Sequence, residues 1–190
     1  LNRIDPLTQL PHRNAFFADL AAQLAHGAGT AWLAAIETAP VARFSAFIRA
    51  MGHAYADALV RATAERVQAW ATPGMQLYMV APSRLAVLMP DGHGVPSPAQ
   101  LDALVAALRE PVHCLGIELC LQPGVGLLEV EAHELRGGDP LRRVMSASWI
   151  AMGTPSGWAV YNRSDDERQR QEFFLVTELA TALSERTELA

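Results

Sequence analysis

The sequence has few cysteines: only Cys114 and Cys120 occur among its 190 residues. They lie an even number of residues apart in a strand-like run, which places both on one face but too far apart along one strand for a disulfide. We therefore expect both to be small apolar filling residues. The sequence also lacks an apolar run of the about eighteen residues that cross a bilayer. Residues 1–10 lack the basic start and apolar middle of a signal peptide.

Positive charge is also scarce. Lysine and arginine total 15 against 20 aspartates and glutamates, which gives a net charge of −5. Binding to a nucleic acid duplex needs a basic face, so the dispersed positive charge argues against such a partner and favours a protein or a small molecule. The histidines lack metal-ligand spacing, and we predict no metal and no cofactor. They are His12, His26, His53, His93, His113 and His133.

Just over half of the residues are apolar, enough for one well-buried core. Apolar residues at helical spacing predict helices over Pro11 to Leu24, Val41 to Met51 and Ala54 to Trp70. Ser97 as cap and Pro98 at the first helical position predict a fourth helix, with its inward residues at Leu101, Leu104, Val105 and Leu108. A further helix after Asp139 should place one set of residues on one side: Leu141, Val144, Ser148, Trp149 and Met152. Short apolar runs predict strands over Thr30 to Thr38, Gln76 to Ala81, Arg84 to Met89, Val112 to Leu121, Val125 to Val130 and Trp158 to Tyr161. The order is mixed α and β.

The C-terminal segment reads as one more helix. Ser164 and Glu167 have the spacing of a capping box. Beyond them an apolar stripe steps by three, four and three residues, through Phe173, Val176, Ala180 and Leu183. We predict that this stripe packs on a partner chain or on a following domain. The expected division is a domain over residues 1–163 and a connector helix over residues 164–190.

Two segments resemble the signatures of GGDEF domains, the family of the bacterial cyclases that make cyclic di-GMP. The run from Asp5 to Arg13 (DPLTQLPHR), followed by Phe16, is similar to DxLTxLPNRxxF, with His12 in place of the asparagine. The run from Gly52 to Leu59 (GHAYADAL) is similar to GHxxGDxLL, with Ala56 in place of a glycine. The resemblance extends to Tyr161.

The resemblance implies an α+β fold of the nucleotidyl cyclase type. Its core is a ferredoxin-like βαββαβ unit with helices around a central mixed sheet. In an active member of the family, two chains each hold one GTP. A ribose hydroxyl of one GTP then attacks the α-phosphate of the other with the help of two divalent metals. Such chemistry needs carboxylates for the metals and glycines where the backbone approaches the nucleotide.

None of the five signature letters survives at the positions that align with GGDEF. Those positions hold Ala81, Pro82, Ser83, Arg84 and Leu85. The alanine adds a side chain where a glycine is expected, and the proline fixes φ and removes an N–H donor. Loss of the acidic pair removes a metal ligand, and the arginine brings a positive charge to the place where cations would bind.

A second family motif, DxDxFKxIN, supplies further metal and nucleotide contacts. Counting back from Gly52 without gaps puts Pro40 and Ala42 at the aspartates, Ser45 at the lysine and Ile48 at the asparagine that reads guanine. Only Phe44 is retained. With an insertion in this loop, Glu37 would instead occupy the first carboxylate position. The structural alternative for Glu37 is a solvated glutamate at a strand end.

Asp57 matches a residue that contacts the guanine edge in active members of the family. It can equally be an anion in the first turn of a helix, and its partner position is held by Ile48, which favours the structural interpretation. The resemblance also places Met152 where a phosphate-contacting lysine is expected. Thr72 and Met75 hold the places of the inhibitory RxxD motif, so feedback by the product is not expected.

The sequence therefore predicts a protein that is not an enzyme: a non-catalytic regulatory or interaction module of cyclic di-GMP signalling. Within the family, a connector helix of this kind often precedes an EAL phosphodiesterase domain, so the expected partners are such a domain, a partner protein or a second copy. Two alternatives stay open, an allosteric GTP sensor without turnover and a residual diguanylate cyclase. The expected location is the cytoplasm, either free or as the cytoplasmic part of a membrane-attached protein.

Overall fold

The computed structural model describes residues 3–175 except 28, 93, 137–138 and 173. Its centre is a five-stranded sheet in the order β2-β3-β1-β6-β7. The strands are β1 (Thr30–Glu37), β2 (Gln76–Ala81), β3 (Arg84–Leu88), β6 (Gly124–Glu131) and β7 (Trp158–Val160). β1 lies between β3 and β6 and is antiparallel to both, whereas β6 and β7 are parallel. The predicted α+β fold with a ferredoxin-like core is confirmed.

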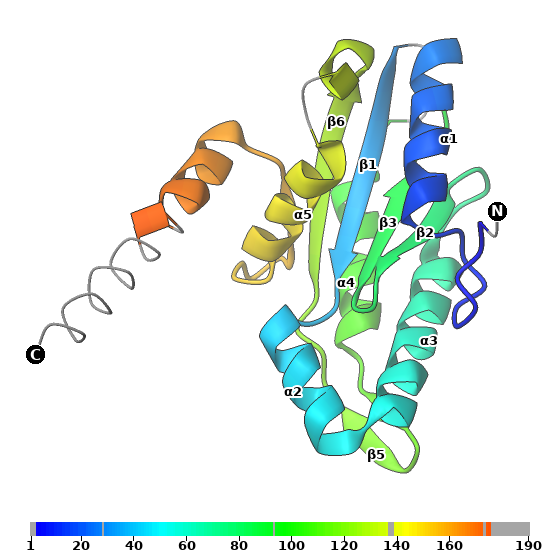
Figure 1. The fold of residues 1–190 in the computed structure, drawn as a ribbon, viewed down its shortest axis with the longest axis vertical. Coiled ribbons are helices and arrows are strands. Elements are labelled where there is room, and N and C mark those ends of the chain that lie inside the picture. Colours follow the sequence, from blue (N-terminus) through cyan, green and yellow to red (C-terminus); the bar gives the residue numbers. More distant parts are fainter. Residues whose placement is uncertain (1–2, 28, 93, 137–138, 173, 176–190) are drawn as a thin grey trace, which may run out of the picture.

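Helices cover both faces of this sheet (Figure 1). They are α1 (Arg13–His26), α2 (Val41–Met51), α3 (His53–Trp70), α4 (Pro98–Arg109) and α5 (Pro140–Ala151), with a 3₁₀ turn at Ala132–Arg136. α4 begins at a capping box formed by Ser97 and Gln100, and Asp139 caps α5 by accepting a hydrogen bond from the Arg142 N–H. Both helix starts agree with the sequence-based prediction.

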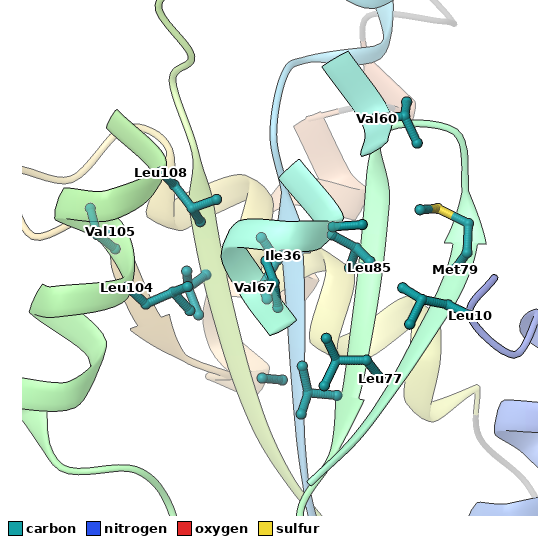
Figure 2. Close-up of a cluster of buried hydrophobic side chains, with 14 of the residues drawn as sticks. Leu10, Ile36, Val60, Val67, Leu77, Met79, Leu85, Leu104, Val105 and Leu108 are labelled. Atoms are coloured by element: carbon teal, nitrogen blue, oxygen red, sulfur yellow. The ribbon is translucent and has the colours of Figure 1, made fainter. Parts of the chain in front are cut away.

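Each face of the sheet has its own apolar core because strand side chains alternate between the faces. Ala34 and Ile36 of β1 join the core beneath α2, α3 and α4, where Val67 and Leu104 lie (Figure 2). Leu33 of β1 joins the core beneath α1 and α5. Glu37 follows the same alternation as Leu33, and its side chain lies on the α1 and α5 face.

α5 packs unusually close to β6. A Cβ atom added at Gly126 would lie 2.3 Å from the Val144 carbonyl oxygen and 2.3 Å from the Ser148 nitrogen. Real Cβ atoms essentially never approach backbone atoms so closely, so a glycine is required there. This close approach holds α5 on the face of the sheet over β6, the strand next to the edge strand β7.

The predicted strand from Val112 to Leu121 is wrong. The chain turns at Leu115 and Gly116, which have φ values of 49° and 89°. The result is a separate hairpin of β4 (Val112–Cys114) and β5 (Ile117–Leu119). The turn also breaks the alternation that the prediction used for the cysteines. Cys114 is buried but Cys120 is exposed, so only the first is an apolar filling residue.

Two further expectations near the C-terminus are wrong. Trp149 does not lie with the buried side of α5, because its side chain is 57% exposed, and Met152 follows the last residue of the helix. A helix over residues 163–172 does begin where one was expected. Its cap is Asn162 rather than Ser164, since the Asn162 Oδ1 accepts from both the N–H and the hydroxyl of Ser164.

The predicted apolar stripe lies outside the described residues: Phe173, Val176, Ala180 and Leu183. Its contacts therefore stay a prediction. Among the residues that the structure describes, no helix is long and apolar enough to cross a membrane.

Candidate functional site

Hydrogen bonds join the turn between β2 and β3 to the residue that follows β1. Pro82 and Ser83 form this turn, and Ser83 is buried. The backbone N–H and the side-chain hydroxyl of Thr38 both donate to the Ser83 carbonyl oxygen, each over 3.1 Å. The positions that the resemblance assigns to a nucleotide-binding hairpin are thus held by hydrogen bonds within the protein. Thr38 was not singled out from the sequence.

Directly beside this turn, Glu37 and Arg84 form an ion pair in which the carboxylate is buried and the guanidinium is partly exposed. They are register partners at the ends of β1 and β3. The Arg84 Nη2 lies 2.9 Å and its Nε 3.2 Å from the Glu37 Oε1. The Glu37 side chain is only 2% exposed, and its Oε2 has no hydrogen-bond partner among the described residues. The interpretation of Glu37 as a solvated strand-end residue is therefore wrong.

These residues do not fit a two-metal centre. Divalent magnesium needs several oxygen ligands in near-octahedral geometry. Among the described residues, Glu37 is the carboxylate beside this turn, and the Arg84 guanidinium already binds it. A second cation close to that guanidinium would be repelled. No group of three or more potential ligands suited to a metal ion occurs within the described part of the chain.

On the opposite side of the hairpin lies a cavity of about 520 Å³. It brings together several positions that the resemblance had assigned to the nucleotide: Phe44, Ile48, Asp57, Ala81 and Pro82. The volume is within the about 300–1,000 Å³ range of small-molecule sites. The structure thus joins these residues in one place, but Glu37, Ser83 and Arg84 do not line this cavity.

Asp57 contributes a carboxylate to the wall of this cavity. α3 begins at His53, and no acidic residue lies in its first turn. The structural interpretation of Asp57 as a first-turn anion is therefore wrong. Next to it, Ile48 presents an apolar side chain to the same cavity. The cavity can accept a hydrogen-bond donor at Asp57, but Ile48 offers no polar partner.

The remaining motif positions have ordinary structural roles. Pro40 is the N-cap residue of α2. Leu85 is buried in the core beneath α2, α3 and α4. Met152 lies against Gly124 after the end of α5. Thr72 and Met75 line a separate surface hollow of about 600 Å³ near the start of β2.

A second cavity, of about 640 Å³, lies on the Glu37 side of the sheet. Its wall includes Glu37 and Arg84 from the strand ends, Trp149 from α5, and Asp166 and Arg170 from the C-terminal helix. Asp166 is buried against α5, although nothing in the sequence distinguishes it from its neighbour Asp165. The ion pair at the hairpin and the C-terminal helix therefore share one cavity.

A sequence profile described as "Diguanylate cyclase, GGDEF domain" matches residues 2–148. The chain is also similar to the cyclic di-GMP phosphodiesterase PA2567 of Pseudomonas aeruginosa, with 31% identity over 183 residues. The match covers 96% of the chain and 31% of that protein, so the chain spans about a third of the relative's length.

Solved structures give the same grouping. The GGDEF domain of PA2567 from Pseudomonas aeruginosa superposes with a TM-score of 0.72 and 29% identity, covering 80% of this chain and 94% of that one. The GGDEF domain of PA1120 from the same organism gives a TM-score of 0.70 at 19% identity, covering 88% and 99%. The second likeness concerns the fold alone.

Proposed function

The chain belongs to the GGDEF domain family of cyclic di-GMP signalling, and we propose that it is a degenerate, non-catalytic member that regulates or binds a neighbouring domain. In this proposal the family fold is kept as a scaffold while the cyclase chemistry is lost. The signature hairpin then serves as a structural element.

The observation that carries the proposal is the ion pair between Glu37 and Arg84. The carboxylate that lies nearest to the signature hairpin on β1 is already neutralised by a side chain of that hairpin. An arginine cannot be deprotonated at physiological pH, so its charge is permanent. The Arg84 guanidinium makes it possible to bury the Glu37 carboxylate here, because a buried charge requires a partner.

The similarity to PA2567 supports a proposal on the regulated domain. PA2567 carries a GGDEF domain and is a cyclic di-GMP phosphodiesterase. We propose that this chain likewise lies beside a phosphodiesterase domain, of the EAL type, and regulates it through the helix that begins at residue 163. A partner protein or a second copy would use the same helix.

The direct test is an assay of the purified chain with GTP and either magnesium or manganese. We expect no cyclic di-GMP above a control without protein. The double variant Ser83→Asp/Arg84→Glu should also be inactive, because Pro82 and Ile48 remain and catalytic residues that act together are not recovered singly. Formation of cyclic di-GMP by the wild-type chain that is abolished by Glu37→Gln or Asp57→Ala would contradict the proposal.

A second candidate, a GTP sensor without turnover, has one observation in its favour. The cavity beside the hairpin keeps Asp57 and Phe44 on its wall and is large enough for a base. Calorimetric titration with GTP and ATP in EDTA would test it. Binding that is specific for GTP and is lost on Asp57→Ala supports a sensor, whereas equal heats for both nucleotides exclude it.

A further inference from the structure

The helix over residues 163–172 is attached to the domain in an unusual way. Asp166 is the one residue in that range that is buried, at 4% exposure, and the others are exposed or partly exposed. Helices normally dock through an apolar stripe. This helix is instead held by a carboxylate, and Figure 1 shows it leaving the body of the domain beside α5.

The Asp166 carboxylate joins three segments of the chain. Its Oδ1 and Oδ2 accept from the Nη1 and Nη2 of Arg142, each over 2.8 Å, which makes a bidentate pair with the start of α5. Its Oδ2 also accepts from the Tyr161 hydroxyl over 2.9 Å. Tyr161 lies just after β7, and the Arg143 guanidinium stacks 4.8 Å above its ring. Bidentate pairs fix direction as well as distance.

A second polar contact lies one turn further along. The Ser146 hydroxyl donates to the Gln169 Oε1 over 2.7 Å. Arg142 and Ser146 are four residues apart on α5, and Asp166 and Gln169 are three apart on the C-terminal helix, so each pair lies on one helix face. Two points of attachment define an axis, and the helix can then leave the domain in one direction.

We propose that Asp166 is the positioning residue that sets the direction in which the C-terminal helix leaves the domain. This inference deepens the proposed regulatory function, on which its biological meaning rests, because a neighbouring domain would be placed by that direction. Glu37 and Arg84 line the same cavity as Asp166. A change at the signature hairpin and a change at Asp166 would therefore both alter the wall of this cavity.

The test measures the distance between two spin labels on the chain. The labels are attached to Ala99→Cys on α4 and Gln171→Cys on the C-terminal helix, both exposed sites, in a Cys120→Ser background where the remaining Cys114 is buried. The parent should give one narrow distance. Asp166→Asn should lose it and give a broad distribution, while Asp166→Glu, which keeps the charge, should keep a single but displaced distance.

Asp165→Asn is the matched control, because Asp165 pairs only with Arg168 in the same helix among the contacts described. It should keep the narrow distance of the parent. If Asp166→Asn proves too unstable to study, Tyr161→Phe removes a single donor to the carboxylate and should broaden the distribution partially.

An unchanged narrow distance in Asp166→Asn, or in Tyr161→Phe where that variant is used, overturns the inference, and so does equal broadening in Asp165→Asn. The distance measurement is independent of catalysis. Cyclase activity would contradict the proposed function and leave the assignment of Asp166 standing, whereas an unchanged distance would do the reverse.

Discussion

Glu37 and Arg84 meet in a place where a single charge is costly. A buried carboxylate without a partner loses its hydration, and removing one member of a buried ion pair typically destabilises a protein by about 3–5 kcal/mol. Arg84 itself is 27% exposed, so water can reach the guanidinium more easily than the carboxylate. Loss of Arg84 should therefore cost more stability than the exposure of Arg84 alone would suggest, because it leaves the less exposed charge, Glu37, without its partner.

We expect Arg84→Met to lower the free energy of unfolding by about 3 kcal/mol, because it leaves the Glu37 carboxylate buried and unpaired. The double variant Glu37→Met/Arg84→Met should recover most of this loss, since apolar residues of similar volume can replace a buried pair. Urea denaturation measures both. Arg163→Met is the control, because its pair with Glu167 is largely exposed to solvent and should leave the stability nearly unchanged. A double variant as unstable as the single one would contradict this account.

Asp166 gives a prediction on pH. Its hydrogen bonds with Arg142 lower the pKa of the carboxyl well below the usual 3.8. A carboxyl whose pKa is depressed by folding contributes stability that is present above its unfolded pKa and is lost as the pH falls towards the folded pKa. The difference in unfolding free energy between the wild type and Asp166→Asn should therefore shrink as the pH is lowered from 5 to about 2. A difference that stays constant over that range would argue against the ion pair.

The contact between β6 and α5 gives a prediction for an element. Gly126→Ala would place a methyl group against backbone atoms of α5 that cannot move aside. We expect a loss of about 2–3 kcal/mol in unfolding free energy, at the upper end of the usual overpacking range. Gly153→Ala is the matched control, because the nearest atom would lie at an ordinary 3.5 Å. Similar stabilities for the two variants would show that α5 does not need this close approach.

The element boundaries show what the sequence alone can predict. Periodicity located β1, the β2–β3 hairpin and all five long helices, because their buried faces repeat at the helical or strand period. The same reasoning merged β4 and β5, since a turn with Leu115 at positive φ has no composition signal apart from Gly116. It also could not choose between Asp165 and Asp166, because which one is buried depends on the phase of the helix.

The site was predictable only in part. The alignment with the GGDEF signature placed Ala81 to Leu85 in a hairpin, and the structure has the β2–β3 turn at these residues. Counting back from Gly52 without gaps, in contrast, assigned the first carboxylate position to Pro40. Glu37 took that position only if the loop carried an insertion. The partner of Glu37 lies 47 residues further along the chain, so the ion pair depends on the strand register rather than on a local motif.

At the scale of the whole molecule, three features bear on the proposed function. The family scaffold is retained, the signature hairpin is closed by internal contacts, and the C-terminal helix is held by Asp166 over the cavity that the hairpin pair also lines. In the proposed function, the domain transmits a change of position and does not turn over a nucleotide. We propose that the Arg84 guanidinium supplies the positive charge that a divalent cation would supply in an active cyclase.

The decisive measurement for this role of Arg84 is calorimetric titration of the purified chain with GTP, once in magnesium and once in EDTA. The same result is expected in both solutions, whether GTP binds or not, because Glu37 is already paired with Arg84 and the described residues include no group of three or more side chains that could hold a metal. GTP binding that requires magnesium in the wild type and is lost in Glu37→Gln would contradict it.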